Sequence, residues 1–260
     1  MKSINFYIET SNRYLLDKYP NAKPITLEDI KNRLTKTNFL GLESTKTRKG
    51  EKQGFLTAIL YLAPHKIVGF NMCPLAITCI KDCLDESGRG RFESVKRARI
   101  VKTLCWIYDK KAFTNQINKD IERYKVKAKK LNLRLAVRLN GTSDINIQYH
   151  FKDTLNRFKT VFFYDYTKVY SYIKNNRFPN YHLTFSYDGT KWNTNHALKC
   201  LNLGYNVAVV FSHSLPSKFL DFKVIDGNKT DLRFLDESSC VVGLTYKKVG
   251  NKYYNNTFVF

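Results

Sequence analysis

Leu133-Arg134-Leu135-Ala136-Val137-Arg138-Leu139 begins a series of short apolar segments that decides the fold. Further segments of this kind follow at residues 160–166, 181–186, 206–211, 222–225 and 241–246. Several are apolar on both faces and are separated by helix-sized gaps, which is typical of a parallel sheet covered by helices. The series therefore predicts an α/β fold, a partial or complete (β/α) barrel with a mostly parallel sheet.

The chain before this series predicts one early strand and two helices. Residues 55–62 are apolar and stop before Pro64, which indicates a strand or a buried segment. Residues 92–131 carry apolar side chains at roughly helical spacing, with a break near Asp109. This spacing predicts two consecutive helices.

Residues 1–43 are expected to form an N-terminal appendage, and residues 44–260 the barrel-like domain. The appendage predicts a short helix from Leu27, because Thr26 can cap it and Asp29 adds negative charge to its first turn. Residues 44–54 are polar and contain glycine, so we expect a loop there.

Polar side chains follow the predicted strands at their carboxyl ends, where parallel sheets place their chemistry. We expect Asp144 and Asp165 to act in catalysis or to orient a ligand. Arg138 is costly to bury unpaired, so a carboxylate such as Asp144 or Asp165, or an anionic ligand, should face it. The expected substrate-binding residues are Arg138, Asn140, Thr167, Thr184, Ser186, Asp226 and Asp231.

Cys73, Cys79 and Cys83 lie within eleven residues of one another and form the best candidate for a cofactor site. Pro74 suits the first turn of a helix, and Cys79 and Cys83 would then share one helix face, with Cys73 in the loop before it. The three thiolates are expected to converge on one metal centre. The alternative is that they are buried core cysteines, as we expect for Cys105, Cys200 and Cys240.

Two kinds of metal centre fit three cysteines. A [4Fe-4S] cluster would leave one iron open, whereas zinc would need a fourth ligand, for which His65 is the nearest candidate. A structural zinc site normally has two pairs of ligands, and that spacing is absent here. We therefore rank an iron–sulfur cluster above zinc.

The formal net charge of +22, from 44 basic and 22 acidic residues, makes a polyanionic partner such as a nucleic acid or nucleotide plausible. The alternative is that lysine is simply abundant in this composition. The basic residues cluster after the cysteines, which favours binding. The expected phosphate-contacting residues are Arg89, Arg91, Arg97, Arg99 and Lys102.

No apolar run approaches the roughly 20 residues that a membrane span needs, and the N-terminus has no apolar signal region. We therefore expect a cytoplasmic protein without a membrane partner, whose thiols stay reduced.

The chain resembles the phage gene product 88 family over about residues 44–247. The resemblance implies phage origin, and so the host cytoplasm, without an established reaction. It rests on the cysteine block and on residues 60–64, 88–91, 97–99, 102–103, 137–144, 164–168, 181–186, 226–227 and 231–234.

A cysteine trio after an early strand and before a βα series is also similar, more distantly, to radical S-adenosylmethionine enzymes. That resemblance implies a [4Fe-4S] cluster and S-adenosylmethionine as its ligand. The spacing here is five residues and then three, where that family has three and then two, and no Gly-Gly-Glu run follows the next strand. The resemblance therefore supports the cluster more than it supports S-adenosylmethionine.

These observations predict an iron–sulfur enzyme of unknown reaction that acts on a nucleotide or nucleic acid. One alternative is a nucleic-acid-binding protein with a purely structural cluster. Another is a divalent-metal nuclease that uses Asp144, Asp165, Asp226 and Asp231.

Overall fold

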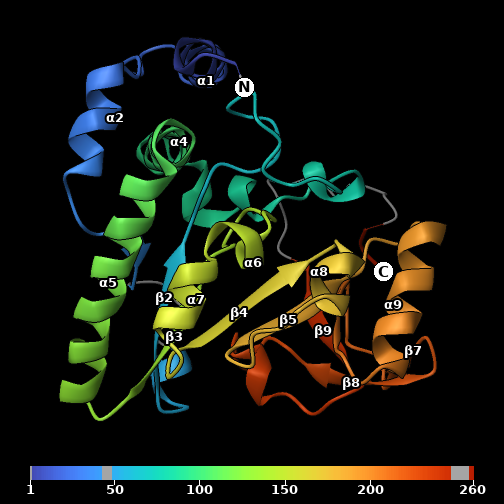
Figure 1. Cartoon of the computed structure of the whole chain (residues 1–260). Coiled ribbons are helices and arrows are strands. Elements are labelled where there is room, and N and C mark those ends of the chain that lie inside the picture. Colours follow the sequence, from blue (N-terminus) through green and yellow to red (C-terminus); the bar gives the residue numbers. More distant parts are fainter. Residues whose placement is uncertain (1, 43–48, 247–257) are drawn as a thin grey trace.

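The predicted series of strands forms a mostly parallel sheet in the computed structural model, which describes residues 2–42, 49–246 and 258–260 (Figure 1). Within these residues the sheet has nine strands. The α/β class is therefore confirmed. The strands are β1 (Leu40–Gly41), β2 (Phe55–Leu60), β3 (Arg134–Arg138), β4 (Phe162–Thr167), β5 (Tyr181–Ser186), β6 (Val207–Phe211), β7 (Lys218–Phe219), β8 (Phe222–Asp226) and β9 (Val241–Thr245).

The strand order is β1-β2-β3-β4-β5-β6-β9-β8-β7. The pairs from β2 to β6, and those of β9 with β6 and β8, are parallel, whereas β1 and β7 pair antiparallel at the two edges. The sequence missed these two edge strands because each has only two residues. In the described residues β1 and β7 do not pair with each other, so closure into a complete barrel stays a prediction.

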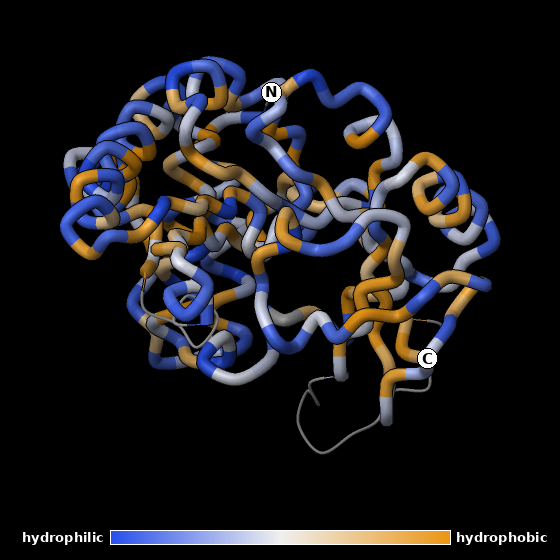
Figure 2. The backbone as a smooth tube through the Cα atoms, turned by 90° about the horizontal axis from the view of Figure 1, so that it is seen from below, coloured by the Kyte–Doolittle hydropathy of each residue, from blue (hydrophilic) through white to orange (hydrophobic). Residues whose placement is uncertain are grey.

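The two faces of the sheet bury different sets of side chains, because successive residues of a strand point to opposite faces. Leu135 and Val137 of β3 belong to the main core. Ala136, between them, belongs to a smaller cluster on the inner face with Phe55 and Tyr164. Figure 2 shows the apolar strands inside the molecule and the more hydrophilic helices around them.

The helices lie around the sheet, and α4 and α5 confirm the predicted helix pair. Asp109 ends α4 and begins α5, where its side chain accepts a hydrogen bond from the Ala112 N–H at 2.9 Å. The helices are α1 (Ile4–Lys18), α2 (Leu27–Leu34), α4 (Glu93–Tyr108), α5 (Lys110–Lys130), α6 (Ile147–His150), α7 (Lys152–Arg157), α8 (Tyr170–Lys174) and α9 (Lys191–Asn202). Among the described residues no helix combines the length and the apolar character needed to cross a bilayer.

The N-terminal region contains two helices rather than the one predicted. The helix from Leu27 is confirmed as α2, with Thr26 and Asp29 in a reciprocal capping box. The helix α1 was not predicted, because the composition of this stretch is polar, although one side of the helix, which includes Leu15, is buried. Side chains of both helices join the main core. The boundary at residue 43 stays a prediction, and the predicted loop at 44–54 lies partly outside the described residues.

The predicted helix across Pro74 to Cys83 is wrong. The segment instead contains one short 3₁₀ turn, η1 (Thr78–Ile80), and two more, η2 (Leu84–Glu86) and η3 (Gly88–Arg91), follow it. Long-range hydrogen bonds explain the irregular backbone. Thr78 Oγ1 donates to the Asp188 carbonyl at 3.3 Å, and Asp82 accepts from the Tyr246 hydroxyl at 2.6 Å.

Candidate functional site

A cavity of about 450 Å³ opens at the carboxyl ends of the parallel strands. Inner-face side chains of neighbouring strands form its wall, including Arg138 of β3, Tyr166 of β4, Ser186 of β5 and Leu244 of β9. Parallel strands bring these positions to one edge of the sheet, as the sequence predicted. The volume falls in the range of small-molecule sites.

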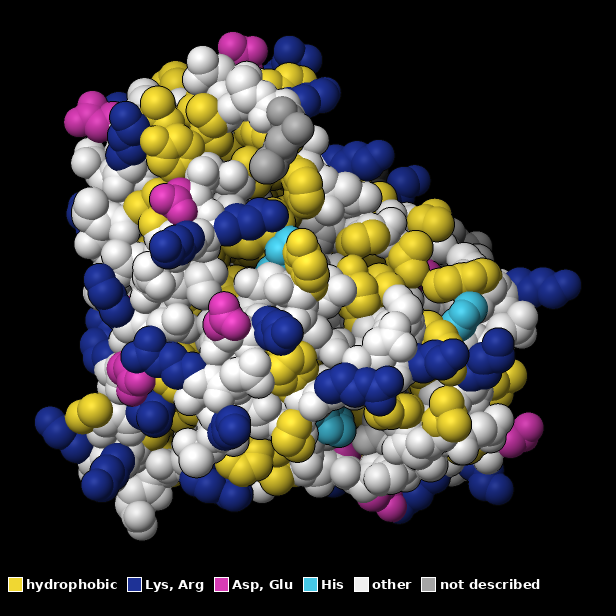
Figure 3. Space-filling view, viewed as in Figure 1, with side chains coloured by type: hydrophobic (Ala, Val, Ile, Leu, Met, Phe, Trp, Pro, Cys, Tyr) yellow, Lys and Arg dark blue, Asp and Glu magenta, His cyan; other side chains and the backbone are white. Residues whose placement is uncertain are grey.

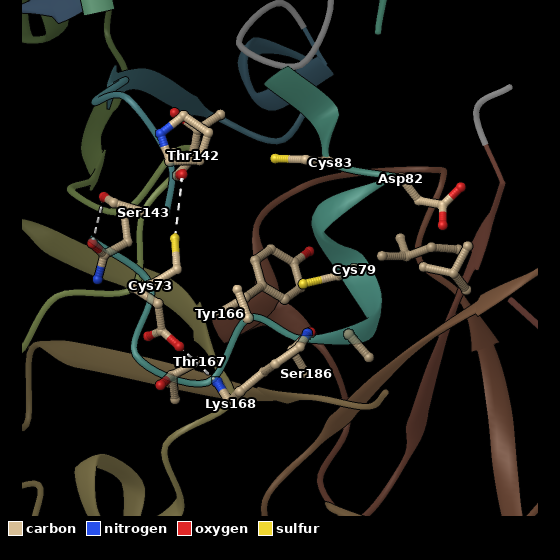
Figure 4. Close-up of a pocket in the computed structure, with 18 of the residues that line it drawn as sticks. Cys73, Cys79, Asp82, Cys83, Thr142, Ser143, Tyr166, Thr167, Lys168 and Ser186 are labelled. Atoms are coloured by element: carbon tan, nitrogen blue, oxygen red, sulfur yellow. Dashed lines mark hydrogen bonds between the residues drawn. The ribbon is translucent and has the colours of Figure 1, made fainter. Parts of the chain in front are cut away.

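All three cysteines of the predicted metal site line this cavity. Figure 4 shows the sulfur atoms of Cys79 and Cys83 directed toward the side of the cavity where Cys73 lies. Cys73 Sγ accepts a hydrogen bond from the backbone N–H of His65 at 3.3 Å and faces the Thr142 carbonyl at 3.8 Å. The trio therefore shares one space although the predicted helix is absent.

The electrostatic setting of these thiols is dominated by burial. Desolvation raises the pKa of Cys73 to about 12 and that of Cys83 to about 11, so without a bound cation both are protonated. Backbone hydrogen bonds from His65 to Cys73 and from Asp85 to Cys83 act in the opposite direction. Such N–H donors are the groups that stabilise a metal-bound thiolate.

In the described part of the chain, no three Cys, His, Asp or Glu side chains are close enough to hold a single metal ion. A zinc ion with Zn–S bonds of about 2.3 Å needs its sulfur ligands nearly in contact. A polynuclear cluster bridges sulfurs that stand further apart. Three thiols around one cavity are the donor type that a [4Fe-4S] cluster takes, and the choice between a cluster and zinc with His65 stays a prediction.

Buried ion pairs hold the end of the cysteine segment. Asp85 and Glu86 follow Cys83 closely, and Lys96 of α4 pairs with both of them. Arg99, one turn further along α4, also pairs with Asp85. Lys96 and Asp85 are each only 1% exposed, so this contact fixes η2 to α4.

Asp144, a predicted catalytic residue, lies in the cavity wall. Its Oδ2 accepts the backbone N–H of Lys168 at 2.9 Å, while its Oδ1 is buried and has no hydrogen-bond partner among the described residues. Burial raises the pKa of Asp144 to about 6. A carboxyl group in this state can accept a hydrogen bond from a ligand or exchange a proton with it near neutral pH.

Arg138 has carboxylate partners, as the sequence predicted. Its guanidinium donates to Asp231 at 3.2 Å, and its Nε lies 3.9 Å from an oxygen of Asp165. Asp165, the other predicted catalytic residue, is fully buried and does not line the cavity. Its oxygens accept from the Asn140 N–H at 2.7 Å and the Tyr181 hydroxyl at 3.0 Å, while burial raises its pKa to about 7.

The structure brings most of the expected substrate-binding residues together and leaves two out. Thr184 is buried, and Asp226 is exposed and accepts the Asn228 N–H at 2.9 Å in a turn. Sequence reasoning missed Lys168, although it directly follows Thr167 at a strand end. The expected residues that line the cavity are Arg138, Asn140, Thr167, Ser186 and Asp231.

The five expected phosphate-contacting residues divide into two groups. Arg89 and Arg91, in η3, are exposed. The other three have internal partners: Arg97 pairs with Asp29 at 3.1 Å, Arg99 pairs with Asp85, and Lys102 donates to the Phe39 carbonyl at 2.7 Å. Burial also lowers the pKa of Lys102 to about 8.

Comparison with known proteins places the chain in one family. No curated protein matches it, and no solved structure does. The family model described as gene product 88 matches residues 34–256, which confirms the resemblance seen in the sequence and extends it slightly at both ends. With most of its length matched, including the cysteine segment and the strand ends around the cavity, the chain belongs to the gene product 88 family.

Proposed function

We propose that this protein is an iron–sulfur enzyme with a radical S-adenosylmethionine-like barrel, in which Cys73, Cys79 and Cys83 hold a [4Fe-4S] cluster. Its substrate would be a nucleotide or a nucleic acid in the infected cell. The observation that carries the proposal is that all three cysteines line the same strand-end cavity as Arg138, Asn140 and Asp144. Cofactor donors and polar side chains that could hold a substrate therefore meet in one place.

Bound to three thiolates, such a cluster would supply an open iron position and one-electron chemistry. The protein's own contribution is to hold the thiols with backbone N–H groups and to present polar side chains beside them. Asp144 has a free carboxylate oxygen for orienting a substrate or moving a proton. S-adenosylmethionine is a subordinate part of the proposal, because the cysteine spacing differs from the family that uses it.

Metal and sulfide analysis after anaerobic purification tests the proposal. We expect brown protein with iron and acid-labile sulfide in equal amounts, about four of each per chain. Cys79→Ala should lose most of the iron. Cys200→Ala is the matched control, since Cys200 is buried in α9 and does not line the cavity.

Three results would count against the cluster. Colourless, iron-free protein would reject it, and equal iron in the two cysteine variants would reject the assigned ligands. Stoichiometric zinc that is lost in His65→Ala would favour the zinc alternative.

A nucleic-acid-binding protein with a structural cluster is the second candidate function. The specific observation in its favour is that Arg89 and Arg91 are exposed shortly after the cysteine segment. The divalent-metal nuclease gains no support, because Asp165 and Asp226 do not line the cavity.

A further inference from the structure

Lys168 is a buried cation in the cavity wall. Unlike Arg138, it has no ion pair with a carboxylate of the described residues. It is 7% exposed, and its ammonium donates to Ser186 Oγ at 3.0 Å (Figure 4). No carboxylate oxygen of the described residues lies within the 4.0 Å ion-pair distance of its Nζ. Arg138, by contrast, lies within that distance of both Asp231 and Asp165.

This arrangement is costly without a ligand. A buried ammonium loses its hydration, and the Ser186 hydroxyl, together with the Phe258 ring 5.1 Å from Nζ, replaces only part of it. An anion placed beside Lys168 would restore the lost interaction and meet two donors at once, because the Ser186 hydroxyl can accept from Lys168 while donating its own proton. An oxyanion is therefore the kind of ligand that would compensate the buried charge of Lys168.

We infer that Lys168 and Ser186 bind the phosphate group of a small phosphorylated substrate, a mononucleotide under the proposed function. The choice of a nucleotide as the phosphorylated ligand rests on the proposed function, whereas the phosphate site itself is argued from Lys168 and Ser186 alone. A phosphate suits the position because it carries several acceptor oxygens for the remaining donors of the ammonium. A mononucleotide is favoured over a polymer because Lys168 is buried inside a cavity of about 450 Å³.

The rest of the cavity provides complementary contacts for such a ligand. Ala208, Val210 and Leu244 give it an apolar side. Asp144 contributes an unpartnered oxygen, which can accept from an N–H or O–H group of the substrate. The wall therefore offers donors for the phosphate and an acceptor for another part of the same molecule.

Calorimetric titration of the full chain tests the inference with nucleoside 5′-monophosphates, the matching nucleosides, inorganic phosphate and glutarate as a carboxylate probe. At least one monophosphate should bind at least tenfold more tightly than its nucleoside. Lys168→Met should weaken its binding by about 10- to 100-fold, a loss of about 1.4 to 2.8 kcal/mol. Ser186→Ala should weaken it less, and Lys174→Met, an exposed lysine of α8, should leave it unchanged.

Thermal melting separates a binding role from a structural one. Methionine keeps much of the volume of lysine and removes a buried charge that has no carboxylate of the described residues within 4.0 Å, so Lys168→Met should melt at the same temperature as the wild type or higher. Clear destabilisation of this variant would overturn the inference. Equal binding of monophosphate and nucleoside, a preference for glutarate, or binding of oligonucleotides in place of mononucleotides would overturn it as well.

The titrations are made on both iron-loaded and metal-free protein, so that two failures can be told apart. Monophosphate binding by a protein that never holds iron would reject the proposed cluster and keep the phosphate site. Iron-loaded protein that binds no phosphorylated probe would reject the phosphate site and keep the cluster.

Discussion

Asp29 shows how much a single predicted side chain does in this fold. It belongs to the capping box of α2 and also pairs with Arg97 of α4 at 3.1 Å. The cap was readable from the sequence because its residues are three apart. The ion pair was not readable, because its partner lies 68 residues away and was assigned to phosphate instead.

Asp29→Asn is expected to lower the free energy of unfolding by about 1 kcal/mol at pH 7. Partial burial alone would raise the pKa of Asp29, but hydrogen bonds from Thr26 and Arg97 outweigh it and hold the pKa below its ordinary value. A lowered folded-state pKa contributes stability above the unfolded value of about 3.9, and this contribution is lost as the pH falls further.

Urea unfolding at pH 7 and at pH 3 measures this effect. The difference between Asp29→Asn and the wild type should shrink at the lower pH, because the stability contributed by the charged carboxylate is partly lost below the unfolded pKa. Asp17→Asn, an exposed acid of α1, is the control and should show no comparable loss. A deficit of the same size at both pH values would show that the charge of Asp29 is not the cause.

At the scale of elements, regular helices and strands were predictable and the cysteine segment was not. The strands β3 to β6 and the pair α4–α5 bury apolar side chains at regular spacing, so local sequence specifies them. The cysteine segment leaves Ile77 70% exposed and takes its shape from bonds to Asp188 and Tyr246, far away in sequence. Pattern alone cannot show such bonds.

Lys96 should be the strongest single anchor of this segment. It is 1% exposed and pairs with Asp85 and Glu86, just after Cys83. Lys96→Met removes one partner of a buried ion pair, and we expect a loss of about 3–5 kcal/mol in the free energy of unfolding. Because Lys168 lacks a carboxylate partner among the described residues, the same substitution there should show no such loss, which makes the two lysines a matched pair.

Urea unfolding of both variants decides the point. If Lys96→Met cost no more than about 1 kcal/mol, Asp85 would be held well enough by Arg99 alone, and Lys96 would not be the anchor. Alkylation rates of the cysteines in metal-free protein give a second measurement. Release of η2 should expose Cys83 and speed its reaction.

At the scale of the whole molecule, parallel strand order explains why much of the site was predictable. The ends of β3, β4 and β5 lie side by side, so Arg138, Thr167 and Ser186 share one rim. Asp165 does not line the cavity, and the sequence could not show this, because a strand residue faces either side of the sheet and one residue of register decides which. The partner of Arg138, Asp231, follows β8, beyond the crossover in strand order, and only the three-dimensional fold could reveal that pairing.

The net charge of +22 acts over the whole surface, and Figure 3 shows Lys and Arg side chains spread widely over one face with fewer acidic ones between them. If a nucleic acid binds this surface, its affinity must fall steeply with salt, by about 0.9 in log K per unit of log salt for each phosphate contact. Of the expected contacts, Arg89 and Arg91 are exposed, whereas Arg99 pairs with Asp85 inside the fold.

We therefore expect Arg89→Ala with Arg91→Ala to reduce the salt slope for duplex DNA by about 2 and to leave the free energy of unfolding within about 0.5 kcal/mol of the wild type. Arg99→Ala should do the reverse, since it removes an internal ion pair and no phosphate contact. Fluorescence anisotropy over a salt series, with urea unfolding of each variant, measures both. A salt slope near zero for the wild type would mean that the positive charge reflects lysine-rich composition. A salt slope unchanged in the double variant would mean that residues outside η3 contact the phosphates.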